Sequence, residues 1–397
     1  MYQIAIIDAV RTPIGKMGGT LKNIPAEALG QTVVQALLSR TGIAPNRIDE
    51  VIFGHCRQSS DNPDIARLIA LRCGIPENIP AYTVMRHCAS GMTAIYNGAM
   101  SISLGENRIV VAGGTESMST APFYIRNARY GLGTGNVELL DAVVEAQFQS
   151  QPQEIYGRFN MGETAERVAE KMGVSRKDQD LFALKSQEKA QAAIKNGYFR
   201  QEIAEVLVPQ KKGPALYFSQ DEFPKETTLS ALAELKPVFR KDGTVTAGNS
   251  SGRNDGASAV LLISLDEANN LGMKPLAIIR SHAVVGVEPG LMGLGPIEAS
   301  KKALARAGMS MNDIDLVELN EAFAAQSVAC QRVLNIPDEK LNVNGGAIAL
   351  GHPIGSSGCR IIVTLAHALR QRRLRYGLAT LCAAGGMGEA MIIEAVQ

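Results

Sequence analysis

Three short motifs in this chain hold the residue types that covalent chemistry through sulfur needs. NVNGGAIALGHPIGSSG (342–358) is centred on His352, LCAAGGMGEAM (381–391) contains Cys382, and VMRHCASGMTAI (84–95) contains Cys88. A thiol close to a histidine can accept an acyl group, because the imidazole can take the thiol proton. The three motifs therefore predict one acyl-transfer site, built from segments that lie far apart in the chain.

Cys88 is the candidate nucleophile. It precedes Ala-Ser-Gly and a helical pattern, so we expect it at or near a helix N-terminus. The free N–H groups and the dipole there would stabilise a thiolate and lower the pKa of the thiol. The alternative is a small buried residue without reactivity, as single cysteines often are. His87 is a poor candidate for the base, because adjacent side chains diverge at a helix start, and we interpret it as structural or pocket-shaping.

Glycines and small residues surround the other candidates. Glycines on both sides of His352 let backbone and ligand approach closely. The turn after Cys382 offers backbone N–H groups to a developing negative charge on oxygen. Asn320 in NEAF (320–323) follows a strand-like run, and a helix cap is its alternative role. TAGNSSGRNDGA (246–257) has the composition of a loop and could contact a ligand.

Composition excludes several other classes of protein. The 397 residues suffice for two domain-sized units, and the net charge of +1 gives no global attraction to nucleic acid or to anionic membranes. No apolar run approaches the ~20 residues of a membrane span. The first residues enter a strand-like run (4–10) without a signal peptide, so we expect a cytoplasmic protein. The cysteines lack the paired spacing of a zinc site, so we expect reduced thiols and no metal. They are Cys56, Cys73, Cys88, Cys330, Cys359 and Cys382.

A degenerate internal duplication positions these residues. GIAPNRIDEVIFG (42–54) and GMSMNDIDLVELN (308–320) share a glycine, an Ile-Asp pair and a strand-like run. Helices and apolar strands that alternate in this way favour a layered α/β architecture. Two similar halves facing each other would bring Cys88 and His352 to one cleft. The matching segments are helical patterns at 28–38 and 297–305, further helices at 92–102 and 361–368, and strands that begin at 109 and 378.

The region between the halves has a different character. Residues 120–249 are more polar and contain an amphipathic helix near 163–172, which indicates an insertion that packs over the site. We therefore divide the chain into three parts. They are a first α/β half (1–119 with 250–269), an inserted loop domain (120–249) and a second α/β half (270–397).

The chain resembles the thiolases, the acetyl-CoA acetyltransferases and 3-ketoacyl-CoA thiolases, over essentially its full length. The motifs that carry the resemblance are RTPIGKMGG (11–19), CASGM, AGGTESMS, MGETAE, VTAGNSSG, NEAFA, GHPIGSSG and LCAAGGMG. The resemblance implies two similar βαβαβαββ halves in a five-layer αβαβα fold. It also implies that the inserted loop domain binds coenzyme A and supports a dimer or a dimer of dimers.

The resemblance further implies a ping-pong reaction on coenzyme A thioesters. His352 would deprotonate Cys88, which would carry the acyl group. Cys382 would act as the acid and base at the α-carbon of the substrate. Asn320, through a held water, and His352 would form one oxyanion hole. The backbone N–H groups of Cys88 and Ala384 would form the other.

The same resemblance implies the binding contacts. Ser251 would contact the pantetheine arm, Lys225 matches a family arginine near the nucleotide end, and Met161 and Met292 would line the acyl pocket. Coenzyme A is then a substrate and product, with no permanently bound cofactor and no metal. The implied partners are acyl-CoA and coenzyme A, without nucleic acid or membrane, in a cytoplasmic homo-oligomer, a tetramer, of fatty acid metabolism.

Four departures from the family pattern bear on the substrate. Ala384 replaces a usual glycine, Met85 a common asparagine, and Asn160 a histidine of the short-chain biosynthetic members. The segment CRQSSDNPDIAR (56–67) matches its family counterpart only in part. These differences do not change the expected reaction type, but they leave the identity of the acyl group in the substrate open.

Two alternatives share the fold. A decarboxylating ketoacyl or hydroxymethylglutaryl synthase has the same nucleophile but lacks a thiol at the place of Cys382. A non-catalytic acyl-CoA-binding scaffold would require a broken site, whereas Cys88, His352, Cys382 and Asn320 are all present.

Overall fold

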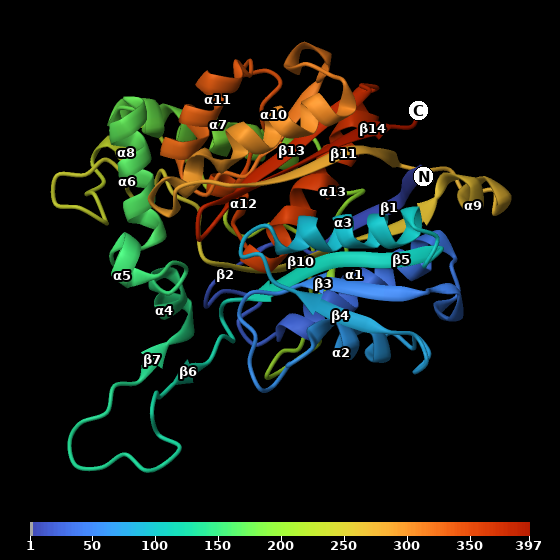
Figure 1. Ribbon diagram of the computed structural model, residues 1–397, viewed down its shortest axis with the longest axis horizontal. Helices are drawn as coiled ribbons and strands as arrows, with labels where there is room; N and C mark the ends of the chain where they lie inside the picture. Colours follow the sequence, from blue (N-terminus) through green and yellow to red (C-terminus); the bar gives the residue numbers. More distant parts are fainter. Residues whose placement is uncertain (1–2) are drawn as a thin grey trace.

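Two similar sets of strands build the large sheet of the computed structural model, which describes residues 3–397 (Figure 1). The first set contains, in spatial order, β4 (Ala81–Val84), β3 (Glu50–Gly54), β5 (Ile109–Ser117), β10 (Asn254–Ser264) and β1 (Ile4–Arg11). The second set contains β12 (Leu316–Leu319), β13 (Tyr376–Ala383), β14 (Met387–Ala395) and β11 (Ala277–Gly286). β1 pairs with β11 in antiparallel register, and this pairing joins the two sets. The short strand β2 (Gly15–Lys16) pairs with β10.

The two strand sets repeat one topology. β3 runs parallel to β4 and β5, as β12 runs parallel to β13. β10 pairs antiparallel with β5 and β1, as β14 does with β13 and β11. A parallel bridge between Val317 and Leu341 stands in the second set where β4 stands in the first. The predicted duplication is therefore confirmed.

Helices form three further layers. α3 (Ser90–Ser103) and α13 (Ile354–Arg372) pack against each other between the two strand sets (Figure 1). α1 (Ala26–Thr41) and α2 (Ile65–Arg72) cover the outer face of the first set. α10 (Gly295–Ala307) and α11 (Ala324–Leu334) cover the outer face of the second. The predicted five-layer αβαβα arrangement is thus confirmed.

The central layer follows from the sequence of its two helices. Every residue of α13 from 355 to 369 is buried, which is the pattern of a helix that is covered on all sides. Most of α3 is buried as well. Both helices contribute to the apolar cluster that also contains inward-facing residues of both strand sets, such as Val110 and Met391.

The first turns of these two central helices touch through glycine. A Cβ atom on Gly91 of α3 would lie 2.8 Å from the backbone nitrogen of Cys359, and one on Gly358 of α13 would lie 2.6 Å from that of Met92. Contacts this short leave no room for any side chain. The N-terminal ends of α3 and α13 therefore lie against each other, backbone to backbone.

The inserted region carries its own short elements. The helix expected near 163–172 is α6, which packs on α11 and on the 3-10 helix Pro289–Leu294. A long loop between β6 and β7 projects away from the body of the protein (Figure 1). The strands here are β6 (Phe123–Tyr124), β7 (Leu140–Asp141), β8 (Val206–Val208) and β9 (Leu216–Phe218). The helices are α4 (Ala142–Phe148), α5 (Gln153–Tyr156), α6 (Met161–Met172), α7 (Arg176–Lys195) and α8 (Leu229–Ala233).

The remaining elements are short. They are the helices α9 (Leu265–Asn270) and α12 (Ala347–Leu350) and the 3-10 helices Pro45–Arg47 and Met311–Asp313. Within residues 3–397, no helix is both long and apolar enough to cross a membrane.

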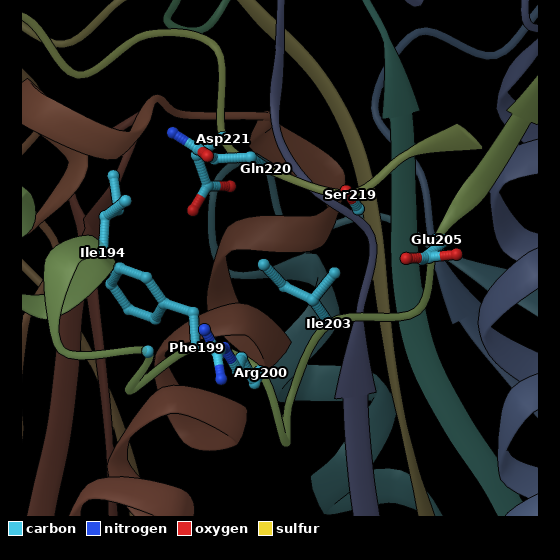
Figure 2. A pocket seen from close by; sticks show the side chains of 9 residues that line it. Ile194, Phe199, Arg200, Ile203, Glu205, Ser219, Gln220 and Asp221 are labelled. Carbon is cyan, nitrogen blue, oxygen red and sulfur yellow. The ribbon is translucent and has the colours of Figure 1, made fainter. Parts of the chain in front are cut away.

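A buried ion cluster ties the inserted region to β1. The guanidinium of Arg11, which has no exposed surface, lies 2.6 Å from Glu202 Oε1 and 2.7 Å from Asp221 Oδ1. The ring of Phe199 stacks 4.9 Å from the guanidinium carbon. Figure 2 shows the cavity of about 460 Å³ beside this cluster, lined by Phe199, Asp221 and Ile203 among others. None of the candidate site residues lines it.

Arg11→Met should destabilise the protein strongly, because it leaves Glu202 and Asp221 buried without a counter-charge. Removal of one partner from a buried ion pair costs roughly 3–5 kcal/mol. The measurement is the free energy of unfolding in urea. The matched control is Arg47→Met, because Arg47 and Glu267 form an exposed pair at 3.2 Å that should contribute about 1 kcal/mol or less. Equal losses of unfolding free energy in the two variants would contradict the conclusion that the Arg11 cluster is a buried, stabilising ion cluster.

Candidate active site

The two halves contribute equivalent positions to the site. Cys88 lies two residues before the first residue of α3, and His352 lies two residues before the first residue of α13. Because the starts of these helices touch, both residues reach the same region. Cys382 enters from the second half at the end of β13 and lies close enough to Cys88 for the two thiols to affect each other's charge. The structure thus places the starts of α3 and α13, which follow Cys88 and His352, at one junction between the two halves.

The turn before α3 presents Cys88. His87 adopts a φ of 47°, in the left-handed region that non-glycine residues seldom occupy. Its carbonyl oxygen accepts hydrogen bonds from Ser90 Oγ at 2.6 Å and from Cys56 Sγ at 3.0 Å. The backbone N–H groups of Cys88 and Ala384 lie near enough to the Cys88 sulfur to lower the pKa of the thiol.

The prediction of a lowered pKa for Cys88 is wrong for the resting structure. Burial raises the pKa of the thiol to about 11, and the Arg57 charge and the two N–H donors offset this only in part. The N-cap of α3 is Ala89, so Cys88 lies outside the first turn, where the dipole acts most strongly. Cys88 is therefore a neutral thiol at rest and needs a base.

His352 has the properties of that base. Burial, with a smaller contribution from Arg360, lowers its pKa to about 4, so the imidazole is neutral. Its Nδ1 lies 2.6 Å from Ser357 Oγ, and that hydroxyl donates its one hydrogen to the carbonyl of Pro353 at 3.0 Å. With the hydroxyl hydrogen directed at Pro353, Nδ1 is assigned the imidazole proton and donates it to Ser357 Oγ. Nε2 is left buried, deprotonated and without a partner in residues 3–397.

Glu116 supports both halves of the site, a role that the sequence analysis missed. Its Oε2 accepts from the backbone nitrogens of Gly355 at 3.0 Å and Cys56 at 3.2 Å, and Oε1 accepts from that of Arg57 at 3.1 Å. His55 Nε2 lies 3.2 Å away. Burial opposes ionisation of this carboxylate, but these partners outweigh it and lower its pKa. The start of α13 is thereby tied to the loop after β3.

Arg57 is a second residue that sequence reasoning missed. Its Nε is buried without a hydrogen-bond partner, and no ion pair forms at its guanidinium in the described chain. Its charge lowers the pKa of Cys88 and, after burial, that of His87. The available signal was the segment 56–67, which matches the family only in part.

Asn320 directly follows β12, and its side-chain amide forms no hydrogen bond within residues 3–397. It has no exposed surface, and neither its Nδ2 nor its Oδ1 has a partner within residues 3–397. The next helix, α11, has Phe323 as its N-cap, and the nitrogen of Phe323 donates to Gln326 Oε1. The helix-cap alternative for Asn320 is therefore wrong. Buried amides without partners are rare, so this one is available to a water molecule or a ligand.

Cys382 faces an apolar surface. It is buried in a cluster with Met292 and Phe323, against which Met161 also packs. Burial, and next to it the neighbouring Cys88, raises the pKa of the Cys382 thiol well above its ordinary value. Its thiol lies 4.0 Å from Gln326 Oε1, which accepts its hydrogen bond. The two candidate acyl-pocket methionines thus belong to, or pack against, the apolar cluster that contains the second thiol.

Ala384 fits its turn without strain. It is not among the residues with positive φ, whereas Gly385 and Gly386 have φ values of 80° and 84°. The left-handed conformations of this turn thus fall on the two following glycines. The N–H group of Ala384 remains directed at Cys88.

The remaining candidates lie farther from the thiols. Ser251 is half-buried and donates its backbone N–H to the carbonyl of Ala322 at 3.0 Å. Lys225 is exposed, and no side-chain contact places it at the site. Asn160 caps α6 and forms a capping box with Glu163, which accounts for the residue type there. Met85 is half exposed. No cluster of three or more His, Cys, Asp or Glu side chains in residues 3–397 could hold a metal ion.

Comparisons with known proteins find similarity along nearly the whole chain. Residues 4–266 match the family model described as thiolase, N-terminal domain, and residues 273–395 match thiolase, C-terminal domain. The chain is 49% identical over 393 residues to an acetyl-CoA acetyltransferase of Chromobacterium violaceum, covering 99% of both chains.

Two solved structures share the fold. The acetyl-CoA acetyltransferase of Bacillus anthracis superposes with a TM-score of 0.97 at 44% identity, covering 100% of this chain and 99% of that one. Human mitochondrial 3-ketoacyl-CoA thiolase in complex with CoA gives a TM-score of 0.94 at 43% identity, covering 100% and 98%.

Iodoacetamide should label Cys88 faster than the other five cysteines, because its pKa of about 11 is lower than the values of about 12 for Cys73 and Cys359. The thiol is protonated at neutral pH, so the labelling rate should rise as the pH approaches that pKa. Arg57→Leu removes a charge that favours the thiolate. It should raise the pKa and slow labelling at fixed pH by about threefold or more.

The control is Arg57→Lys, which keeps the positive charge and should stay near the wild-type rate. Labelling is followed by peptide mass spectrometry across pH 7 to 10. Faster labelling of Cys56 or Cys73, or an Arg57→Leu profile that superposes on the wild type, would refute this account.

Proposed function

The chain belongs to the thiolase family, and on this premise we propose that Cys88 carries the acyl group in transfer between coenzyme A thioesters. The observation that carries the proposal is that the backbone N–H groups of Cys88 and Ala384, from two separate segments, both lower the pKa of the Cys88 thiol. His352, a neutral imidazole whose Nε2 has no partner in the described residues, lies just before the adjoining helix α13. These are the parts that acyl transfer through sulfur requires: a nucleophile, a base and two oxyanion donors.

Acylation begins from neutral groups. His352 Nε2 takes the proton of Cys88, and the thiolate attacks the carbonyl carbon of the substrate. A carbon–sulfur bond forms while charge moves to the carbonyl oxygen, where the N–H groups of Cys88 and Ala384 stabilise it. With a 3-ketoacyl thioester, the bond between C2 and C3 then breaks. The acyl group stays on Cys88, and the enolate of acetyl-CoA departs.

Cys382 supplies the proton at the α-carbon. Its raised pKa keeps it protonated, so it can give the proton to the enolate in thiolysis, and in condensation it takes one from acetyl-CoA. Asn320, through a water molecule, and His352 stabilise the thioester oxygen. An incoming coenzyme A then attacks the acyl-Cys88, its thiol proton passes to the Cys382 thiolate, and His352 returns a proton to Cys88.

Coenzyme A is the group that donors and products share. We propose that Ser251 contacts its pantetheine arm, that Lys225 lies toward the nucleotide, and that Met161 and Met292 line the acyl pocket. The relative solved with CoA supports this use of the fold. The substrate class is acetyl-CoA and 3-ketoacyl-CoA, in fatty acid metabolism and without a permanently bound cofactor. Two assays test the proposal: loss of the acetoacetyl-CoA enolate with coenzyme A, and an acetyl mass on the Cys88 peptide.

We further propose that the enzyme is a cytoplasmic homo-oligomer, a dimer or a dimer of dimers, divided into the parts 1–119 with 250–269, 120–249 and 270–397. The projecting loop between β6 and β7 supports the assembly, because it exposes Tyr130, Leu132 and Leu139 to solvent. Light scattering after size-exclusion chromatography measures the mass directly. A monomer at micromolar concentration would refute this part.

Cys382→Ala should suppress the making and breaking of the carbon–carbon bond yet leave acyl exchange between enzyme and coenzyme A. Cys88→Ala should abolish both, because only Cys88 carries the acyl group and Cys382 moves a proton. Exchange of labelled coenzyme A into acetyl-CoA measures the first half-reaction alone. If Cys382→Ala lost both half-reactions to the same extent, the two roles would be misassigned.

Asn320→Ala should lower turnover by roughly 10²–10³-fold, the cost of one lost oxyanion donor. The melting temperature should change little, since the side chain has no protein partner to lose. Steady-state kinetics and thermal unfolding are measured on the same preparation. A variant that unfolds while its remaining folded fraction keeps normal turnover would favour a structural role instead.

A further inference from the structure

Glu389 is a fully buried carboxylate outside the catalytic group. It lies on β14 with no exposed surface, directly opposite Leu381, the residue before Cys382. Cys382 itself pairs with Gly388. Glu389 therefore belongs to the hairpin whose turn presents Cys382 and Ala384. Neither the family motifs nor the proposed mechanism assigns it a function.

Three elements converge on this carboxylate. Its Oε2 accepts from Thr93 Oγ1 of α3 at 2.7 Å and lies 3.5 Å from Arg86 Nη1, two residues before Cys88. Its Oε1 lies 2.6 Å from His282 Nε2 of β11. The His282 ring stacks on Tyr96 of α3, with centroids 3.7 Å apart. One carboxylate thus connects three parts of the protein: the turn before α3 that contains Cys88 (the nucleophile turn), the helix α3 itself, and β11, the strand beside the hairpin that contains Cys382.

Arg86 transmits this constraint to the nucleophile. Its Nη1 also donates to Thr93 Oγ1 at 2.9 Å. Its backbone nitrogen donates to Ser90 Oγ at 2.8 Å, and its carbonyl accepts from Ala89 at 3.1 Å. Hydrogen bonds of both the side chain and the backbone of Arg86 therefore hold the turn that contains Cys88. The opposite end of the network is the β13–β14 hairpin itself.

The two oxyanion donors lie on the two segments that the network connects. The N–H of Cys88 belongs to the nucleophile turn, and that of Ala384 belongs to the hairpin. Apolar side chains could replace the whole network and still permit folding, since a buried ion pair contributes little net stability relative to well-packed apolar residues. What a connected polar network provides is one fixed geometry.

We propose that Glu389 is a positioning residue for acyl transfer, which sets the nucleophile turn against the Cys382 hairpin so that both N–H donors meet the reacting carbonyl. The inference rests on the proposed function, because it assumes that these donors serve an acyl group on Cys88. Arg86 and Thr93 act with Glu389, and none of the three touches the substrate.

The test compares Glu389→Gln with Glu394→Gln. The first substitution keeps the shape of the side chain but removes its charge. It should lower kcat for acetyl transfer by about tenfold or more while KM for acetyl-CoA changes less than threefold. Formation of the acetyl adduct on Cys88 should slow by the same factor. Glu394 lies on the same strand and pairs with Arg280 and Arg375, remote from both thiols, so its variant should keep wild-type kcat.

A second variant covers the case in which Glu389→Gln fails to fold. Arg86→Gln alters a side chain that is about one-third exposed, so it should fold, and it should slow acetylation in the same way. In the double variant the two effects should not add, because both remove the same link. Wild-type kcat in Arg86→Gln, or a lowered melting temperature with unchanged kcat in Glu389→Gln, would overturn the proposal. An inactive wild type would instead refute the proposed function itself.

Discussion

The backbone contact between the first turns of α3 and α13 is the constraint on which the site depends. Gly91 and Gly358 allow the two helices to meet with no side chain between them. Any larger residue there would push apart the two turns that end in Cys88 and His352. Glu116 secures the same junction by accepting hydrogen bonds from Gly355 and from the loop after β3. The proposed nucleophile and the proposed base thus come from different halves, and their spacing is set by packing.

Burial governs the chemistry as strongly as position does. The same dry environment raises the pKa values of Cys88 and Cys382 and lowers that of His352. All three groups are neutral at rest, so only a small fraction of Cys88 is thiolate at neutral pH, and this slows its reaction with oxidants and electrophiles. Charge appears only when a substrate arrives, and the N–H donors are already in place to receive it.

The sequence predicted the parts of this arrangement that follow from local patterns. The repeated glycine and Ile-Asp pair revealed the duplication, and the helical patterns predicted α3 and α13, whereas the five-layer arrangement came from the family resemblance. Cys88, His352 and Cys382 were identifiable from their small-residue surroundings. The sign of the Cys88 pKa shift was not, because it depends on burial by distant segments, whereas the helix dipole is local. Glu116, Arg57 and Glu389 were missed since their partners lie in other motifs.

The place of β10 in the sheet has a consequence for biosynthesis. β10 pairs with both β1 and β5, yet the inserted region separates it from them in the chain. A ribosome therefore releases β1, β3, β4 and β5 well before the strand that completes their sheet. Until residue 264 emerges, the nascent chain exposes unpaired edges on β1 and β5, which are templates for aggregation. Contacts this distant in sequence also make folding slow, which prolongs the time over which these edges are exposed.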